Sequence, residues 1–264
     1  MPMPKLRTLQ SDLARVQRYV LRIRSLLDSR GYYPRLGVYA DSVFLSLFSK
    51  SIRVSETICA LVGDGFNEEA FGMTRTLLDL LITVRFIANK KTERRAERFF
   101  NFLARDTVSW LGIIQTHYPG KPLPPMPDLP KILKTASTYP DPHRWAGSGM
   151  SAYTLAMEPS TWEFDDIGEP LTLQFWYDAV FHWTSHFVHP TIAALESHVV
   201  KAGKDIFTVH ARANILPHKY GELTLFNTAN MLGQVVCQFF HGMNDNLPER
   251  YRRYGEALSR SFVR

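Results

Sequence analysis

The segment from Asn67 to Ala88 limits the fold more than any other part of the sequence, because it has helical spacing and is apolar nearly all round. Such a helix cannot lie on a surface, since it has no broad polar face to turn toward water. It has to be enclosed by other elements, and the other long apolar segments show helical spacing as well. The sequence therefore predicts an all-α fold, a multi-helix bundle of about six to eight helices around this central one.

Further helices are expected at residues 11–31, 41–62, 93–116, 171–200 and 222–243. In the first of them, apolar residues from Leu13 to Leu27 recur at alternating spacings of four and three, the a/d seam of a helix packed nearly parallel to another. The partner of this seam is either the domain's own core or a second copy of the chain. Pro190 removes a backbone hydrogen bond from the helix at 171–200, so we expect a kink there.

Two other segments do not read as helices. The six prolines between Tyr118 and Lys131 predict an exposed Pro-rich loop, because proline is excluded from helix interiors and central strands. Alternating residues from Phe207 to Leu216 are typical of a short strand or an extended loop, so the bundle has room for one minor β-hairpin. Since no internal repeat is found, residues 1–264 are expected to form a single helical domain.

The charge balance bears on the partners of the chain. Its 264 residues include 31 Lys and Arg against 25 Asp and Glu, and the formal net charge of +6 favours anionic partners such as RNA. The alternative is that the charges only keep helix faces soluble. Arginines gather near both ends of the chain, at positions 15, 18, 22, 24 and 30 and at positions 250, 252, 253, 260 and 264.

The compartment is predicted from what the sequence lacks. It has two cysteines, no apolar leader at its start and no apolar run long enough to cross a bilayer. These observations predict a cytoplasmic protein with no membrane partner.

A narrow polar stripe is expected on the helix that contains residues 175–190. On a helical wheel four polar side chains fall on one side of it, namely Asp178, His182, Ser185 and His189. The opposite side is apolar and predicts a core contact. The stripe faces either an inner polar cavity or water, and the sequence leaves both interpretations open.

The central helix adds a charged pair to these candidates. Arg75 and Asp79 share one stripe of a segment that is otherwise apolar. A buried arginine is costly unless it is paired, and Asp79 is one turn away. A self-contained ion pair is one interpretation. The other is that the planar guanidinium also reaches a ligand phosphate or carboxylate.

A metal site on the polar helix is a further hypothesis. His182 and His186 have the spacing that lets two imidazoles hold one ion, and Asp178 is the third candidate ligand. Trp183 stands where the metalloprotease pattern has Glu. No phosphate-binding loop, dinucleotide fingerprint or nucleophile elbow occurs. We therefore expect no cofactor, with a divalent metal on this helix as the alternative.

Several short motifs in the middle of the chain belong to one pattern. They are Ser49-Lys50-Ser51, Gly65, Ala70, Arg75 to Asp79, Trp145-Ala146-Gly147, Tyr177 and Ser185 to Pro190. Together they resemble a bacterial family known as domain of unknown function 5677, over residues 40 to 200. In that family Glu usually stands at the position of Asp79, and no agreed function can be carried over from it.

That family is similar to the HEPN class of helical bundles, many of which are RNases in toxin and phage-defence systems. The HEPN signature has His a few residues after Arg, a spacing found here from Arg212 to His218 with Pro217 between them. The analogy implies instead that Arg75 and His189 meet from two packed helices, as phosphate binder and general acid or base. The other residues it points to are Asp79, Ser185 and Tyr177 as orienting groups and Arg144 and Trp145 as ligand contacts.

The leading functional prediction is a bacterial accessory or effector protein that binds an anionic ligand, foremost RNA, and has metal-independent RNase activity. One alternative is a non-catalytic, homo-oligomeric interaction module that associates through the seam from Leu13 to Leu27. Another is a metal-dependent enzyme that uses Asp178, His182 and His186.

Overall fold

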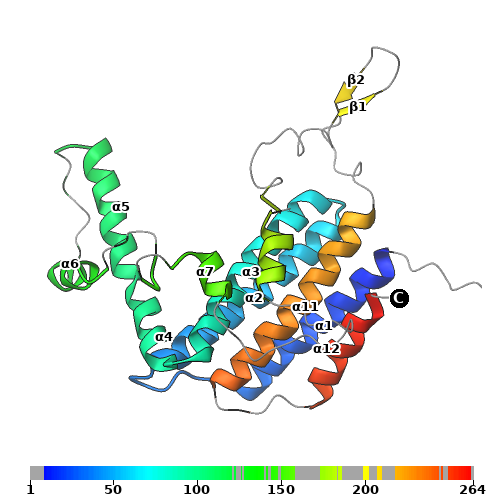
Figure 1. The fold of residues 1–264 in the computed structure, drawn as a ribbon, viewed down its shortest axis with the longest axis horizontal. Coiled ribbons are helices and arrows are strands. Elements are labelled where there is room, and N and C mark those ends of the chain that lie inside the picture. The colour runs from blue at the N-terminus through cyan, green and yellow to red at the C-terminus, as the bar shows by residue number, and fades with distance from the viewer. Residues whose placement is uncertain are drawn as a thin grey trace, which may run out of the picture.

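A computed structural model describes residues 9–262 except 121, 123–125, 127, 140, 142–143, 148–149, 158–172, 183, 186–198, 202–206, 210–217, 244 and 246–248. It confirms the predicted all-α bundle. The body of the bundle consists of α1 (Leu9–Arg30), α2 (Tyr39–Gly63), α3 (Asn67–Asn89), α11 (His218–Gly242) and α12 (Glu249–Phe262) (Figure 1). Within the described ranges, none of the helices is long and apolar enough to cross a membrane.

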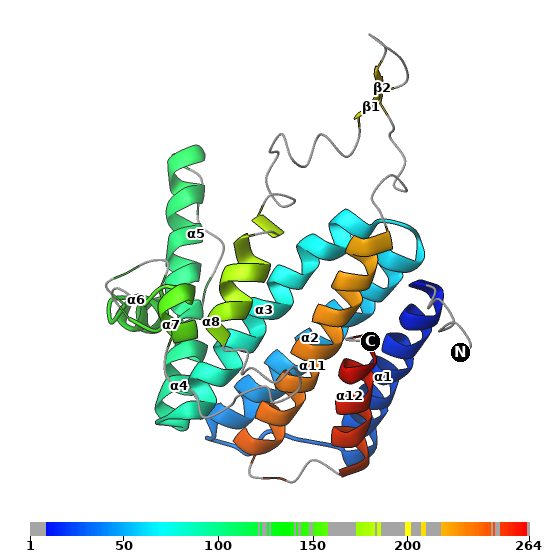
Figure 2. The same cartoon turned by 45° about the vertical axis from the view of Figure 1, so that its right-hand side comes forward.

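Helix α3 lies at the centre of the bundle, as its composition predicted. It packs most extensively against α11 and next against α2, and the three helices run side by side in both views (Figures 1 and 2). Leu77, Leu78 and Leu81 on this helix are at most 1% exposed. Burial of so much apolar surface makes α3, together with α2, a large contributor to the hydrophobic core.

The seam of α1 is used inside the bundle. Val16, Val20 and Ile23 are buried where α1 packs against α2, α11 and α12. The helix ends before Gly31, whose φ of 57° suits a residue without a side chain. Of the two partners considered for the seam, these residues contact the domain's own core, and association with a second copy stays a prediction.

The helix predicted at 93–116 is divided in two, α4 (Thr92–Asn101) and α5 (Leu103–His117). At the junction the Arg98 carbonyl accepts a hydrogen bond of 2.7 Å from the Tyr139 hydroxyl, and the Tyr139 ring packs edge-on against Phe102. The Phe102 N–H still donates to the Arg98 carbonyl at 3.2 Å, so Tyr139 packs onto the junction without replacing a helical hydrogen bond. The prediction of one continuous helix was wrong, because the helix is interrupted at Phe102.

The Pro-rich loop ends earlier than predicted. Helix α6 (Leu129–Ala136) has Pro130 in its first turn, where proline's missing N–H costs no helical hydrogen bond. The loop was expected to continue to Lys131 because proline is excluded from helix interiors, but Pro130 lies in a first turn rather than in an interior.

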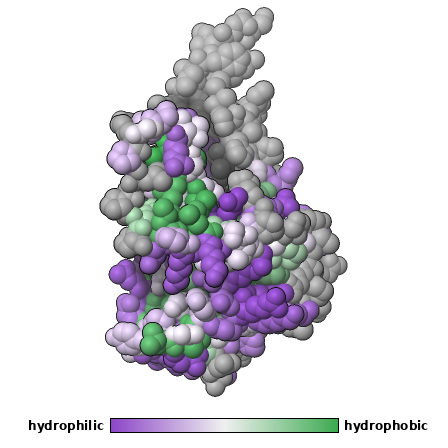
Figure 3. All heavy atoms as spheres, turned by 90° about the vertical axis from the view of Figure 1, so that its left-hand side faces the viewer, coloured by the Kyte–Doolittle hydropathy of each residue, from purple (hydrophilic) through white to green (hydrophobic). Residues whose placement is uncertain are grey.

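An apolar stripe lies exposed on α5. Leu103, Trp110 and Ile113 are 66%, 49% and 59% exposed, and their spacing places them along one side of the helix. Figure 3 shows apolar side chains gathered on the face of the molecule that α4, α5 and α6 form.

The segment predicted as one long helix at 171–200 has three different conformations. Helix α8 (Leu173–Trp176) follows the short α7 (Ala152–Met157) and runs into a π-helical turn, η2 (Tyr177–Phe181). Strand β1 (Val199–Lys201) pairs antiparallel with β2 (Phe207–Val209), with Val200 opposite Thr208. The helix therefore does not reach Val200. The expected kink at Pro190 lies outside the described residues.

Candidate functional site

The π-helical turn η2 is the first element of the candidate site. In such a turn the backbone hydrogen bonds run from i to i+5, so one extra residue is inserted and every later side chain is rotated around the helix axis. Turns of this kind are frequent at functional sites. Because η2 packs against α3, its side chains meet the central helix beside Arg75.

Arg75 is held by two contacts from this segment. Its guanidinium carbon lies 3.8 Å from the centre of the Phe181 ring, a cation–π contact. Its Nη1 donates to Ser185 Oγ at 3.3 Å, and the Ser185 hydroxyl donates to the Phe181 carbonyl at 2.6 Å. Tyr177 stacks on Phe181 with ring centres 4.4 Å apart. The side chain is thus fixed by residues more than a hundred positions away in the sequence.

Asp79 is near Arg75 but does not hold it. The contacts of Arg75 within the described part of the chain are those with Phe181 and Ser185, and no ion pair with Asp79 is formed there. Burial raises the pKa of the Asp79 carboxyl above its ordinary 3.8, and the charge of Arg75 opposes this only in part. The self-contained ion pair is therefore the wrong interpretation of this pair.

The raised pKa has a consequence for stability. Folding makes Asp79 harder to ionise, so between the pKa values of the unfolded and the folded state the folded chain holds a proton that the unfolded chain has already lost. Its contribution to stability is therefore lost as the pH rises from about 3.8 through the pKa of the folded state. We expect Asp79→Asn to be more stable than the wild type at pH 7 and to lose this advantage near pH 4, as measured by urea midpoints. Asp178→Asn, at an exposed position, is the control, and an Asp79→Asn variant less stable at both pH values would contradict the burial argument.

The predicted polar stripe is only partly brought together. Ser185 faces α3, whereas Asp178 and His182 are exposed. The wheel assumed an α-helical phase, and the π-helical turn changes it between Asp178 and Ser185. The apolar side was predicted correctly for Trp176 and Val180, each 4% exposed. His189 lies outside the described residues, so its place beside Arg75 stays a prediction.

The two ligand contacts suggested by the resemblance lie elsewhere. The Trp145 ring packs edge-on against Phe86 and Phe99, and its carbonyl accepts a hydrogen bond of 2.6 Å from Arg98 Nε. Phe86 is eleven residues after Arg75 on α3, or about 16 Å along the helix axis. Arg144 is exposed and pairs with Asp141 at 3.4 Å. Trp145 thus anchors its loop to α3 and α4, away from Arg75.

The metal hypothesis is not settled by these positions. Asp178 and His182 lie exposed around the π-helical turn, and His186 is outside the described residues. Among the described residues there is no cluster of three or more His, Cys, Asp or Glu side chains able to hold an ion. A metal at this helix therefore stays a prediction.

Sequence reasoning missed two cavities with basic linings. One of about 530 Å³ lies between α4 and α6, where Arg94, Arg98 and Lys134 line it. The other lies between α1 and α12 and brings together arginines from the first helix with the last one. For this second cavity the basic clusters at the two ends of the chain were the available signal, but nothing in a single sequence indicated that the two ends meet.

Comparison with known proteins places the chain in a family. The profile of a family of unknown function, DUF5677, matches residues 41–206, and the chain belongs to this family. The match covers α2 to β1, which includes Arg75, η2 and Ser185, and so confirms the resemblance seen in the short motifs. No curated protein and no solved structure matched the chain.

Proposed function

We propose that the protein binds an anionic ligand, RNA in the first place, at the site formed by α3 and η2, and that it cleaves RNA there without a metal. The observation that carries the proposal is the way Arg75 is held. A guanidinium has several N–H donors, and within the described residues only Nη1 of Arg75 is engaged by a protein acceptor. The remaining donors stay available for the paired oxygens of a phosphate.

The surroundings of Arg75 favour an anion as the ligand. Phe181 stacks beneath the guanidinium and Ser185 holds one edge, so little side-chain freedom is lost when a ligand binds. Asp79 is the neighbouring acid, and burial, which raises the pKa of its carboxyl, weakens its competition with a ligand for Arg75. The net charge of +6 adds a long-range attraction for nucleic acid.

The proposed chemistry uses the RNA's own hydroxyl. A base removes the proton of the 2′-hydroxyl, the oxygen attacks the adjacent phosphorus, and the 5′-oxygen leaves with a proton from an acid, which yields a 2′,3′-cyclic phosphate. Histidine titrates near neutrality and suits the proton transfers, and His189 is our candidate. Arg75 neutralises charge on the phosphate, while Asp79, Ser185 and Tyr177 orient the groups. The similarity to HEPN RNases that the motifs imply supports the same chemistry.

The test is cleavage of labelled RNA by the wild type, His189→Ala and Arg75→Gln, each with and without EDTA. We expect cleavage that survives EDTA, leaves cyclic phosphate ends and falls about a hundredfold to ten-thousandfold in His189→Ala. His117→Ala, at an exposed position on α5, is the matched histidine control. It should cleave as the wild type does, whereas the loss of cleavage in His189→Ala purified in the same way excludes a contaminating nuclease as the source of the activity.

Two results would contradict the proposal in different ways. Cleavage that disappears in EDTA would move the chemistry to the metal hypothesis at Asp178 and His182. Absence of both binding and cleavage would leave the non-catalytic interaction module. The surface for such a module is then the exposed apolar stripe of α5 rather than the buried seam of α1.

A further inference from the structure

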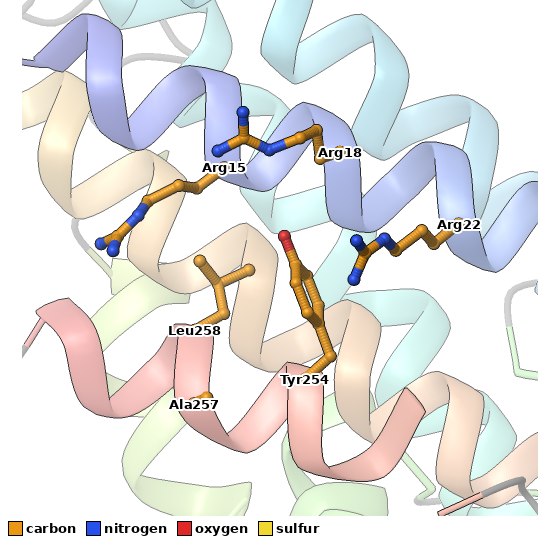
Figure 4. Close-up of a pocket in the computed structure, with 6 residues that line it drawn as sticks. All are labelled: Arg15, Arg18, Arg22, Tyr254, Ala257 and Leu258. Atoms are coloured by element: carbon orange, nitrogen blue, oxygen red, sulfur yellow. The ribbon is translucent and has the colours of Figure 1, made fainter. Parts of the chain in front are cut away.

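The two arginine-rich ends of the chain meet in space. Helices α1 and α12 pack against each other and run side by side in both views (Figures 1 and 2). Between them lies an open cavity of about 310 Å³, the α1–α12 groove (Figure 4). Its lining consists of Arg15, Arg18 and Arg22 from α1 and Tyr254, Ala257 and Leu258 from α12. Neither helix belongs to the segment that the family profile matches.

The arginines of this groove have fewer carboxylate partners than other arginines of the chain. Arg24 donates to Glu56 at 3.0 Å, and Arg35 pairs with the buried Asp41. By contrast, Arg18 and Arg22 are exposed, and neither has a carboxylate partner among the described residues. The third arginine, Arg15, is 4.0 Å from Asp12 and does not enter this comparison. The groove therefore keeps at least two positive charges that no carboxylate in the described part of the chain compensates.

The arrangement of these charges fits a polymer better than a single phosphate. Arg15, Arg18 and Arg22 follow one another at spacings of three and four residues, which places them along one side of α1. From the first to the last they extend over about 10 Å of the helix axis. A row of separate positive charges is suited to the repeated phosphates of a nucleic-acid strand.

The other lining residues offer little for bases or lipid tails. The Tyr254 ring already has the Arg22 guanidinium carbon 4.2 Å from its centre and stacks with Tyr19 at 5.7 Å. Leu258 is only 5% exposed, so it cannot insert into a bilayer. The exposed Arg18 and Arg22 are thus the groups that a phosphate backbone can contact here, and contacts to phosphate carry no sequence information.

We propose that the α1–α12 groove binds the phosphate backbone of single-stranded RNA independently of its sequence. It is a second contact surface, separate from the α3–η2 site. That the ligand is RNA rests on the proposed function, whereas the position of the groove does not. The groove increases affinity for the strand and leaves the chemistry to the residues around Arg75.

The experiment is a binding titration by fluorescence anisotropy, with labelled oligo(U) and oligo(A) over a series of KCl concentrations. We compare the wild type with Arg18→Gln/Arg22→Gln and with a control of equal charge change, Arg53→Gln/Lys90→Gln, at exposed positions outside the groove. The groove variant should bind both oligonucleotides about tenfold more weakly. The slope of log Kd against log salt should fall by about 1.4, since each lost contact to a single strand accounts for about 0.7. The control should stay within about twofold of the wild type.

The outcomes separate this inference from the proposed function when Arg75→Gln is included. If the groove variant binds as the wild type does, the inference is overturned, even if Arg75→Gln has lost binding or cleavage. If the groove variant is weakened and Arg75→Gln is not, the inference stands and the role of Arg75 falls. A wild type that binds neither oligonucleotide overturns both the inference and the proposed function. Tighter binding of the wild type to anionic lipid vesicles than to RNA overturns the inference about the groove alone. Far-ultraviolet circular dichroism and melting temperatures verify that each variant is folded.

Discussion

Replacing Phe239 with alanine is expected to lower the free energy of unfolding by about 3–5 kcal/mol. Phe239 is fully buried on α11 at the point where three other rings converge. It stacks on Phe48 with ring centres 4.3 Å apart and meets Tyr32 and Phe240 edge-on at 5.2 and 5.3 Å. The substitution removes the apolar surface of a whole ring and leaves a cavity that the surrounding rigid rings can fill only in part.

Urea unfolding followed by circular dichroism measures this loss. Tyr33→Ala is the control, because Tyr33 is 83% exposed and its truncation should change the free energy of unfolding by less than about 0.5 kcal/mol. A loss below about 1 kcal/mol for Phe239→Ala would show that the aromatic cluster is not the tightly packed centre described here.

A single added methyl group at Gly242 is expected to destabilise the fold. A Cβ at this position would lie 2.4 Å from Cε2 and 2.5 Å from Cζ of Phe44. Phe44 is 1% exposed, so its ring cannot turn out into solvent to make room. Overpacking of this kind costs about 1–3 kcal/mol. Replacing glycine by alanine in a helix brings a gain of only up to about 1 kcal/mol, so the overpacking cost is the larger of the two.

The matched control is Gly112→Ala on α5. An added Cβ there meets nothing within 4 Å, so only the helix propensity acts and the variant should be more stable by up to about 1 kcal/mol. The two glycine substitutions are thus expected to shift the melting temperature in opposite directions. Phe44→Leu should recover part of the loss in the Gly242→Ala background. If Gly242→Ala is stabilising, the close approach of α11 to Phe44 is not present in solution.

The parts of the fold that were predicted correctly depend on local periodicity. The apolar spacing of α1 and the nearly uniform apolarity of α3 follow from residues within one helix, and burial of these residues agrees with both patterns. Errors arose where a distant residue decides the local structure. The break between α4 and α5 falls at Phe102, whose ring packs edge-on against Tyr139, a residue far along the chain.

The candidate site shows the same division. Arg75, Ser185 and Tyr177 were chosen from the sequence, and the structure brings them into one cluster through Phe181. The role of Phe181 was missed because a phenylalanine on an otherwise apolar helix edge usually indicates a core position. A π-helical turn has no residue pattern that distinguishes it from an α-helix, so the wheel could not place Asp178 and His182 correctly.

The position of α11 has a consequence for how the chain is made. Helices α2 and α3 pack against α11, yet α3 ends at Asn89 and α11 begins only at His218. At a translation rate of about 5–20 residues per second, α3 leaves the ribosome on the order of ten seconds before its main partner. During this interval the apolar side of α3 that α11 later covers is exposed to solvent or bound by a chaperone. The nascent chain is therefore most prone to aggregation before its last quarter is synthesised. A ribosome that stalls before α11 is complete would release an incomplete chain with exposed apolar surface.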